Sequence, residues 1–178
     1  MNINIDALTS DQWMSLWLIL SAIFGLAVGS FLNVVIWRVP LKMSVIKGGS
    51  VCPKCREAIT AKENIPLFSY IFLQGKCRHC KAKISFQYPA VEMLTSIVWI
   101  ITTWTVGLHY YTFAYLIFFT ALIALSGIDI QTHLLPNKIV YPSGITFVAI
   151  IAIWAVASSN LEILRNCTIV GVVYFLFL

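Results

Sequence analysis

Charged residues are scarce in this chain of 178 amino acids. They make up only 11% of the sequence, whereas hydrophobic residues make up 60%. A typical soluble domain carries about 25% charged residues, and here the apolar residues form runs long enough to cross a bilayer. The composition therefore excludes an ordinary soluble domain and predicts an integral membrane protein.

Positive charge is absent from the beginning of the chain. Residues 1–11 contain neither lysine nor arginine, and the first basic residue is Arg38, behind the apolar segment 13–37. A secretory signal peptide carries its positive charge in front of the apolar segment. We therefore predict that 13–37 is a permanent transmembrane helix with its N-terminus outside the cell. Its Gly25-x-x-x-Gly29 step is typical of closely packed membrane helices.

The positive charge of the chain is concentrated in one loop. Ten of the twelve lysines and arginines lie between Arg38 and Lys83, where only Glu57 and Glu63 oppose them. Basic charge in one interhelical loop is typical of the cytoplasmic side of a membrane protein. Because topology accounts for this crowding, we expect no nucleic-acid partner. We do expect contact with membrane lipids.

Three more apolar segments and an apolar tail follow this loop. We predict helices at 89–106, 110–128 and 139–157, whereas the tail 167–178 would rise only about 18 Å against a hydrocarbon core of roughly 30 Å. The predicted fold class is an all-α polytopic membrane protein with four complete transmembrane helices and a partial fifth. The predicted domains are 1–37 (tail and first helix), 38–89 (cytoplasmic loop) and 90–178 (membrane core, expected to continue in a longer protein).

Four cysteines in two pairs lie inside the basic loop. The pairs are Cys52-x-x-Cys55 and Cys77-x-x-Cys80, with 21 residues between them. A two-residue gap allows both sulfurs of a pair to reach one ion, and Zn²⁺ favours four thiolates in a tetrahedron. A reducing cytoplasm disfavours disulfides. We therefore predict a structural zinc site with all four cysteines as ligands; spare thiols and a redox pair are the alternatives.

Asp129 is the residue whose position suggests catalysis. It stands at the end of the third predicted helix, before a break through Leu134-Leu135-Pro136, so its carboxylate should lie at the cytoplasmic membrane face. Ionisable groups at such a depth are costly and often functional. Peptide hydrolysis by carboxylates needs two that share a proton. Glu92, expected in the first turn of the second helix, is the only candidate in this sequence to approach Asp129. A carboxylate that merely faces water is the alternative.

Several stretches of the chain together resemble the type IV prepilin peptidases. They are Gly29-Ser-Phe-Leu-Asn-Val-Val-Ile-Trp-Arg-Val-Pro40, the cysteine pairs around Asn64-Ile-Pro66, Ile84-Ser-Phe-Gln-Tyr-Pro-Ala-Val-Glu92, and Asp129 through Pro136. Members of that family are bacterial inner-membrane aspartic endopeptidases. They remove the leader from type IV prepilins and type II secretion pseudopilins, and many also methylate the new N-terminus with S-adenosylmethionine.

The resemblance implies roles for individual residues. Asp129 corresponds to the first catalytic aspartate of the family, and the four cysteines correspond to a zinc-binding tetrad found in many members. Gly29, Ser30, Asn33 and Arg38 belong to a signature associated with the methyltransferase part, although we assign them no chemical step. The second catalytic aspartate lies in a Gly-x-Gly-Asp motif, which these 178 residues do not contain. We therefore expect the chain by itself to cleave no prepilin.

Two other functions are compatible with the sequence. One is a non-catalytic membrane scaffold whose zinc loop binds a partner, and the other is a transporter that uses Asp129 as an ion site. A Gly-x-Gly-Asp motif further along the gene would favour the peptidase. Its absence from a complete reading frame would favour the scaffold, and additional buried charges in later helices would favour the transporter.

Overall fold

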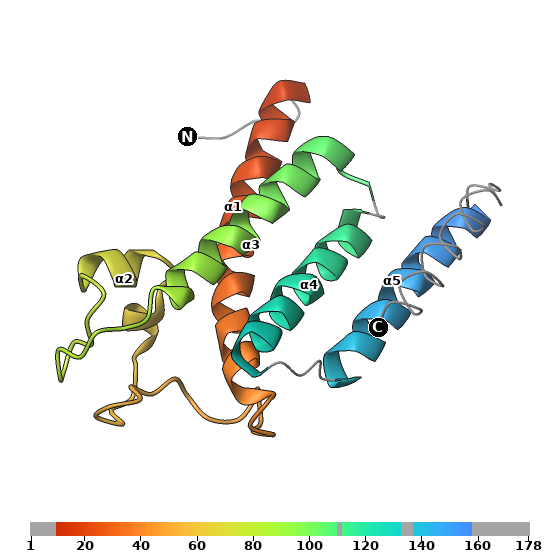
Figure 1. The fold of residues 1–178 in the computed structure, drawn as a ribbon. Helices are drawn as coiled ribbons and strands as arrows, with labels where there is room; N and C mark the ends of the chain where they lie inside the picture. The colour runs from red at the N-terminus through yellow and green to blue at the C-terminus, as the bar shows by residue number, and fades with distance from the viewer. Residues whose placement is uncertain (1–9, 110–111, 133–136, 158–178) are drawn as a thin grey trace.

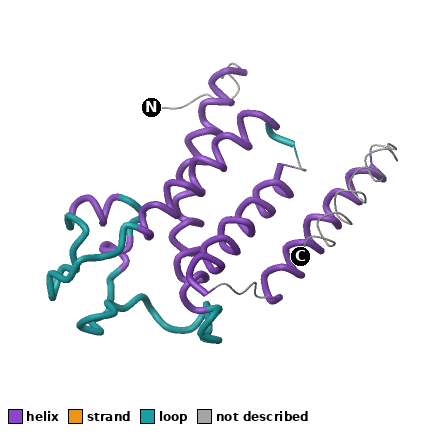
Figure 2. Tube along the Cα trace, viewed as in Figure 1, coloured by secondary structure: helices purple, strands orange, loops and turns teal. Residues whose placement is uncertain are grey.

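A computed structural model describes residues 10–109, 112–132 and 137–157. The fold consists of long helices and one lobe of loops between the first two of them (Figure 1). The long helices are α1 (Ser10–Arg38), α3 (Gln87–Val106), α4 (Thr112–Thr132) and α5 (Asn137–Ala157). The lobe, residues 39–86, contains the short 3-10 helix η2 (Ala61–Asn64) and α2 (Phe68–Phe72). Figure 2 shows helices and loops, and the described residues form no strand beyond two isolated bridges.

Three helices are long and apolar enough to cross a membrane. They are α1, α3 and α4, whereas α5 contains a shorter apolar stretch, Val140–Trp154. Many large apolar side chains on these helices are exposed, as expected for a surface that a bilayer covers. The predicted all-α membrane fold is thus confirmed. The expected partial helix at 167–178 lies outside the described residues.

The beginning of α3 differs from the prediction. The helix starts at Gln87, because the Ser85 Oγ accepts the Gln87 N–H at 3.2 Å and so satisfies one of the free donors of the first turn. Pro89 is tolerated two residues later, still within that turn. Glu92 consequently lies in the second turn of the helix and not in the first.

α1 and α3 form the most extensive helix contact of the fold. A Cβ atom added to Gly25 would come within 2.6 Å of the Ser96 Cα, and one added to Gly29 within 2.6 Å of the Glu92 Cα. Glycine at both positions therefore allows the two backbones to touch. The Ser96 hydroxyl also donates to the Ala22 carbonyl at 3.0 Å across the interface. The close packing predicted from Gly25-x-x-x-Gly29 is present.

α4 and α5 pack in turn beside this pair. A small core joins α1 to α4, made of Leu32, Ile36, Ala124 and Ile128. The Trp99 Nε1–H of α3 donates to the Thr120 Oγ1 of α4 at 3.0 Å. α5 contacts α4 through the rings of Phe118 and Phe147, whose centroids are 4.8 Å apart. The lobe does not interrupt this bundle.

Successive long helices alternate in direction (Figure 1). The C-terminal ends of α1 and α4 and the N-terminal ends of α3 and α5 therefore lie at one end of the bundle, together with the base of the lobe. α4 continues through Thr132, because residues 130–132 contain no helix breaker. Asp129 thus lies in the last helical turn, at the lobe end of the bundle, and the helix extends four residues beyond its predicted end at Ile128.

Candidate metal centre and membrane-edge carboxylates

The first cysteine pair lies in a tight turn. The Cys52 N–H donates to the Glu57 carbonyl at 2.9 Å, and the Arg56 N–H donates to the Cys52 carbonyl at 2.9 Å. An isolated bridge between Val51 and Ala58 closes the turn. Arg56 adopts a left-handed φ of 59°, which reverses the chain directly after the second cysteine.

The second cysteine pair repeats this turn. The Cys77 N–H donates to the Ala82 carbonyl at 2.8 Å, and the Lys81 N–H donates to the Cys77 carbonyl at 3.0 Å. Lys76 and Lys83 form the matching bridge, and Lys81 has a φ of 58°. The lobe therefore presents its four sulfurs from two equivalent turns.

The four sulfur atoms meet at one point of the lobe. All of them lie within 4.8 Å of one another, with 3.8 Å between Cys52 and Cys80 and 4.0 Å between Cys55 and Cys77. In a tetrahedral zinc–thiolate site with bonds of about 2.3 Å, neighbouring sulfurs are about 3.8 Å apart. The observed spacing fits a metal site with four thiolate ligands. His79, inside the second pair, is exposed and lies outside this cluster.

The pKa values of Cys52 and Cys55 are shifted in opposite directions. The backbone N–H groups of Cys55 and Lys54 hydrogen bond the Cys52 sulfur and lower the pKa of Cys52 to about 6. For Cys55, the Glu57 N–H acts to lower the pKa, but desolvation and the surrounding sulfurs outweigh it and raise the pKa to about 12. One thiolate is thus favoured, and further negative charge in the cluster is disfavoured. A bound cation would remove that repulsion.

Arg38 organises the beginning of the lobe. Its guanidinium group donates hydrogen bonds at 2.9–3.0 Å to the carbonyl oxygens of Ser44, Lys47, Gly48 and Gly49. A planar guanidinium carries five N–H donors in a fixed arrangement, which suits several carbonyls at once. The contacts of this signature residue are therefore structural, since they fold residues 39–49 around the end of α1.

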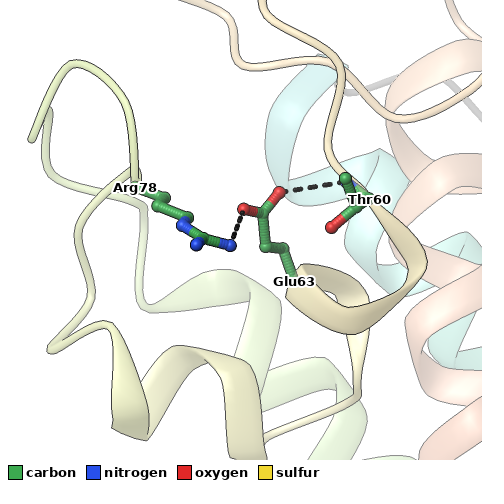
Figure 3. Close-up of polar contacts among 3 residues, drawn as sticks. All are labelled: Thr60, Glu63 and Arg78. Carbon is green, nitrogen blue, oxygen red and sulfur yellow. Dashed lines mark hydrogen bonds and ion pairs between the residues drawn. The ribbon is translucent and has the colours of Figure 1, made fainter.

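Glu63 joins the two halves of the lobe (Figure 3). Its Oε2 accepts the Thr60 N–H at 3.0 Å, and its Oε1 lies 3.1 Å from the Arg78 Nη1, inside the second cysteine pair. The Thr60 N–H contributes most to lowering the pKa of Glu63, and Arg78 lowers it further. Because Thr60 follows the first turn and Arg78 belongs to the second, this carboxylate helps to hold the two turns together.

Glu92 connects the membrane helices to the lobe. Its side chain is buried, with the residue only 7% exposed, and its Oε2 accepts the Leu67 N–H at 2.7 Å. The Ser30 side chain of α1 also hydrogen bonds this carboxylate. Leu67 has φ 60° and ψ −49°, and the Phe68 N–H donates to the Pro66 carbonyl at 2.6 Å, which makes a strained γ-turn. Glu92 therefore fixes the turn from which α2 begins.

The structure does not bring Glu92 to Asp129. Glu92 packs on α1 at Gly29, whereas Gly127, close before Asp129, packs on α1 at Ile36. Seven residues of helix separate these two levels by about 10 Å. Asp129 is exposed, and its side chain makes no hydrogen bond or ion pair with another residue of the described ranges. The expected approach of the two carboxylates is therefore not observed.

The contacts of Glu92 and its neighbours were not predicted from the sequence. Asn33, also from the N-terminal signature, donates through its Nδ2 to the Tyr88 carbonyl at 3.0 Å. Ser30, Asn33 and Glu92 thus hold the lobe ends of α1 and α3 together. A carboxylate within an apolar span was a signal for such a contact, but the sequence alone did not identify Leu67 as its partner.

Comparison with known proteins gives the family. Residues 23–106 match the sequence family described as the bacterial peptidase A24 N-terminal domain. The chain is 40% identical to the prepilin leader peptidase/N-methyltransferase of Neisseria gonorrhoeae, over 69% of this chain and 51% of that protein. It is 36% identical to the type 4 prepilin-like proteins leader peptide-processing enzyme of Escherichia coli O78:H11, over 82% of this chain and 60% of that protein. No solved structure matches.

The fold defines a multi-pass helical membrane protein with a loop domain whose four cysteines could hold a metal ion. With the sequence matches, these features show that the chain belongs to the prepilin leader peptidase family, as its motifs predicted. The chain spans about half the length of the curated relatives it matches.

Proposed function

We propose that this chain is part of a membrane aspartic endopeptidase that removes the leader from type IV prepilins or type II secretion pseudopilins. The observation that carries this proposal is the position of Asp129, an exposed carboxylate in the last turn of α4, at the lobe end of a membrane bundle. The names of the relatives, which refer to prepilin leader processing, support the class of substrate.

The proposed chemistry uses two carboxylates. The ionised one takes a proton from a water molecule, which attacks the scissile carbonyl, and the protonated one gives its proton to the leaving amine. Asp129 would be one member of the pair. The other would be the aspartate of a Gly-x-Gly-Asp motif, which these 178 residues do not contain. We therefore expect the 178-residue chain alone to leave prepilin uncut, and processing by this chain would contradict the two-carboxylate mechanism.

Substitution of Asp129 in the full-length protein tests the proposal. Asp129→Asn keeps the size of the side chain but removes its ability to exchange a proton, so we expect leader removal to fall by about 10² to 10⁴. Immunoblots of prepilin mixed with membranes measure the cleavage. Glu57→Gln, which neutralises an exposed carboxylate of the lobe, is the matched control and should process prepilin normally. Full activity of Asp129→Asn would refute the assignment.

The four-cysteine cluster is proposed to hold a structural zinc ion. Cys52, Cys55, Cys77 and Cys80 would complete its tetrahedron and leave no position for substrate or water. The zinc would therefore stabilise the lobe and take no part in hydrolysis. Metal analysis of the purified protein and of a variant with serine at all four positions measures the site directly.

Methylation of the newly exposed N-terminus is a second proposed activity. It is favoured by the name N-methyltransferase that several relatives carry. S-adenosylmethionine would supply the methyl group, and no residue of this chain is assigned to binding it. Transfer of a labelled methyl group to processed pilin by the full-length enzyme tests this activity.

The proposed location is the bacterial inner membrane, with the N-terminus outside and the lobe in the cytoplasm. The concentration of ten basic residues between Arg38 and Lys83 supports this orientation. Protease added outside intact spheroplasts should then leave the lobe uncut and should cut it in inverted vesicles. Cleavage in intact spheroplasts would reverse the orientation.

A further inference from the structure

The short helix α2 exposes an apolar face that the rest of the lobe does not cover. Phe68, Ile71 and Phe72 follow the i, i+3, i+4 spacing of one helix face, and they are 55%, 61% and 82% exposed. Phe68 and Phe72 also line a hollow of about 220 Å³. Large exposed apolar patches mark places where a protein meets a partner or a membrane.

Two contacts fix α2 to the beginning of a membrane helix. The Leu67 N–H, directly before α2, donates to Glu92 in the second turn of α3. The ring of Tyr70 meets the ring of Phe86, the residue before α3, edge to face with 6.5 Å between centroids. Glu92 lies only five residues, about 8 Å, along the helix from Gln87. α2 is therefore held near the level at which α3 enters the bilayer.

The position of α2 in the fold agrees with this level. Figure 1 shows α2 to the side of the bundle, beside the first part of α3, and not beyond the C-terminal end of α1. Phe86 is itself 65% exposed and extends the apolar surface from α2 towards the membrane helix. The exposed aromatic side chains are thus continuous with a surface that faces lipid.

The charge of the lobe indicates which occupant fits this face. Lysines and arginines outnumber acidic residues by ten to two in the segment from Arg38 to Lys83. An apolar helix face within a basic lobe is the combination that binds the interface of a bilayer containing anionic phospholipids. A basic partner would meet repulsion there.

We propose that α2 is an interfacial helix, which inserts Phe68, Ile71 and Phe72 into the boundary between headgroups and acyl chains of the bilayer that the bundle spans. The contact of Glu92 with the strained turn at Leu67 fixes the depth of α2 relative to the membrane helices. The lobe would then be held against the membrane surface at its base and at α2. This inference does not depend on the peptidase activity.

Photocrosslinking of the full chain tests the proposal. We would replace Phe72, or Lys54 as a matched exposed control in the first cysteine turn, with p-benzoyl-phenylalanine, reconstitute the protein in phosphatidylethanolamine–phosphatidylglycerol vesicles, and irradiate it. Mass spectrometry should find several-fold more phospholipid adducts at position 72 than at position 54. Equal yields at both positions, or adducts at position 72 only to a second copy of the chain or to added prepilin, would overturn the proposal.

A second variant separates membrane contact from folding. Because Phe72 is 82% exposed, Phe72→Ser should leave thermal unfolding in detergent unchanged. In vesicles that expose the lobe, the same variant should be cut by protease several-fold faster than the unaltered chain. An unchanged cutting rate in vesicles would contradict the interfacial role, and so would an equal increase in detergent.

Discussion

Buried Glu92 is the residue through which the lobe and the membrane helices are joined. Its carboxyl group accepts a hydrogen bond from the Leu67 N–H and so supports a turn that a non-glycine residue rarely adopts. Strained turns persist only where the surroundings hold them. Weakening this contact should therefore release the beginning of α2 before it affects the bundle.

Glu92→Leu removes the acceptor and leaves the Leu67 N–H unpaired. We expect this to destabilise the docked lobe by about 1–3 kcal/mol. Glu92→Gln keeps an uncharged acceptor and should have a smaller effect. Limited proteolysis of the lobe in detergent measures both variants, and Glu57→Leu is the control at an exposed position. Equal protease resistance in Glu92→Leu and the unaltered chain would show that the contact holds nothing in place.

The contacts of Glu63 should make the stability of the lobe depend on pH. Its pKa lies below the usual value of 4.5, chiefly because of the Thr60 N–H and then Arg78. A carboxylate whose pKa is lowered by folding contributes stability above its unfolded pKa, and that contribution is lost as the pH falls through the folded pKa. The stability difference between the unaltered chain and Glu63→Gln should therefore shrink from about pH 6 to about pH 3.

Chemical unfolding of the lobe at several pH values measures this difference. Comparison of the two proteins at each pH cancels the effect of acid on the cysteines, which both share. A difference that stays constant over this range would mean that the carboxylate of Glu63 contributes nothing through its charge.

At the scale of elements, the contact between α1 and α3 depends on glycine. The backbone of α3 occupies the place where a side chain on Gly29 would lie, 2.6 Å from the Glu92 Cα. Gly29→Ala should force the helices apart and lower stability by about 1–3 kcal/mol. Thermal unfolding in detergent measures the loss. Gly49→Ala is the control, since a Cβ there meets no atom within 4 Å; an equal effect of both would argue against the packing role.

The long helices were predictable because their apolar runs are long. α1, α3 and α4 lie close to the predicted ranges, and α3 begins two residues earlier, at Gln87, whose N–H donates to the Ser85 Oγ. α2 was not predicted, since five residues are too few to show a helical period. An amphipathic pattern needs a window of at least about eleven residues to be recognised.

The cysteine cluster could be predicted from the sequence, whereas the contact between Glu92 and Leu67 could not. The cysteine cluster was predictable because the Cys-x-x-Cys spacing itself encodes the turn that places two sulfurs together. The contact of Glu92 with Leu67 was not, because it depends on the close approach of α1 and α3 and on a left-handed backbone at a leucine. The role of Asp129 remains a prediction.

At the scale of the whole molecule, the lobe has few buried side chains of its own. Among its described apolar residues, Cys52 and Cys77 are the buried ones, and both belong to the sulfur cluster. A small domain with so little buried apolar surface gains its stability from a metal or from its attachments. The lobe should therefore be the part of the protein most sensitive to chelation.

Removal of metal should loosen the lobe and spare the bundle. After treatment with a strong chelator, or with serine at all four cysteine positions, we expect protease to cut residues 39–86 much faster. Circular dichroism should show that the helices are retained. Full protection of the lobe after verified loss of metal would contradict the structural-zinc assignment.

The lobe leaves the bundle at the end of α1 and returns at the beginning of α3, where Asn33 and Tyr88 are already hydrogen bonded. Because that hydrogen bond joins α1 directly to α3, the two helices are held together at the point where the lobe leaves and rejoins the bundle. We therefore expect that replacement of residues 39–86 by a short linker would leave the contact between α1 and α3 in place, because that contact is made by the helices themselves.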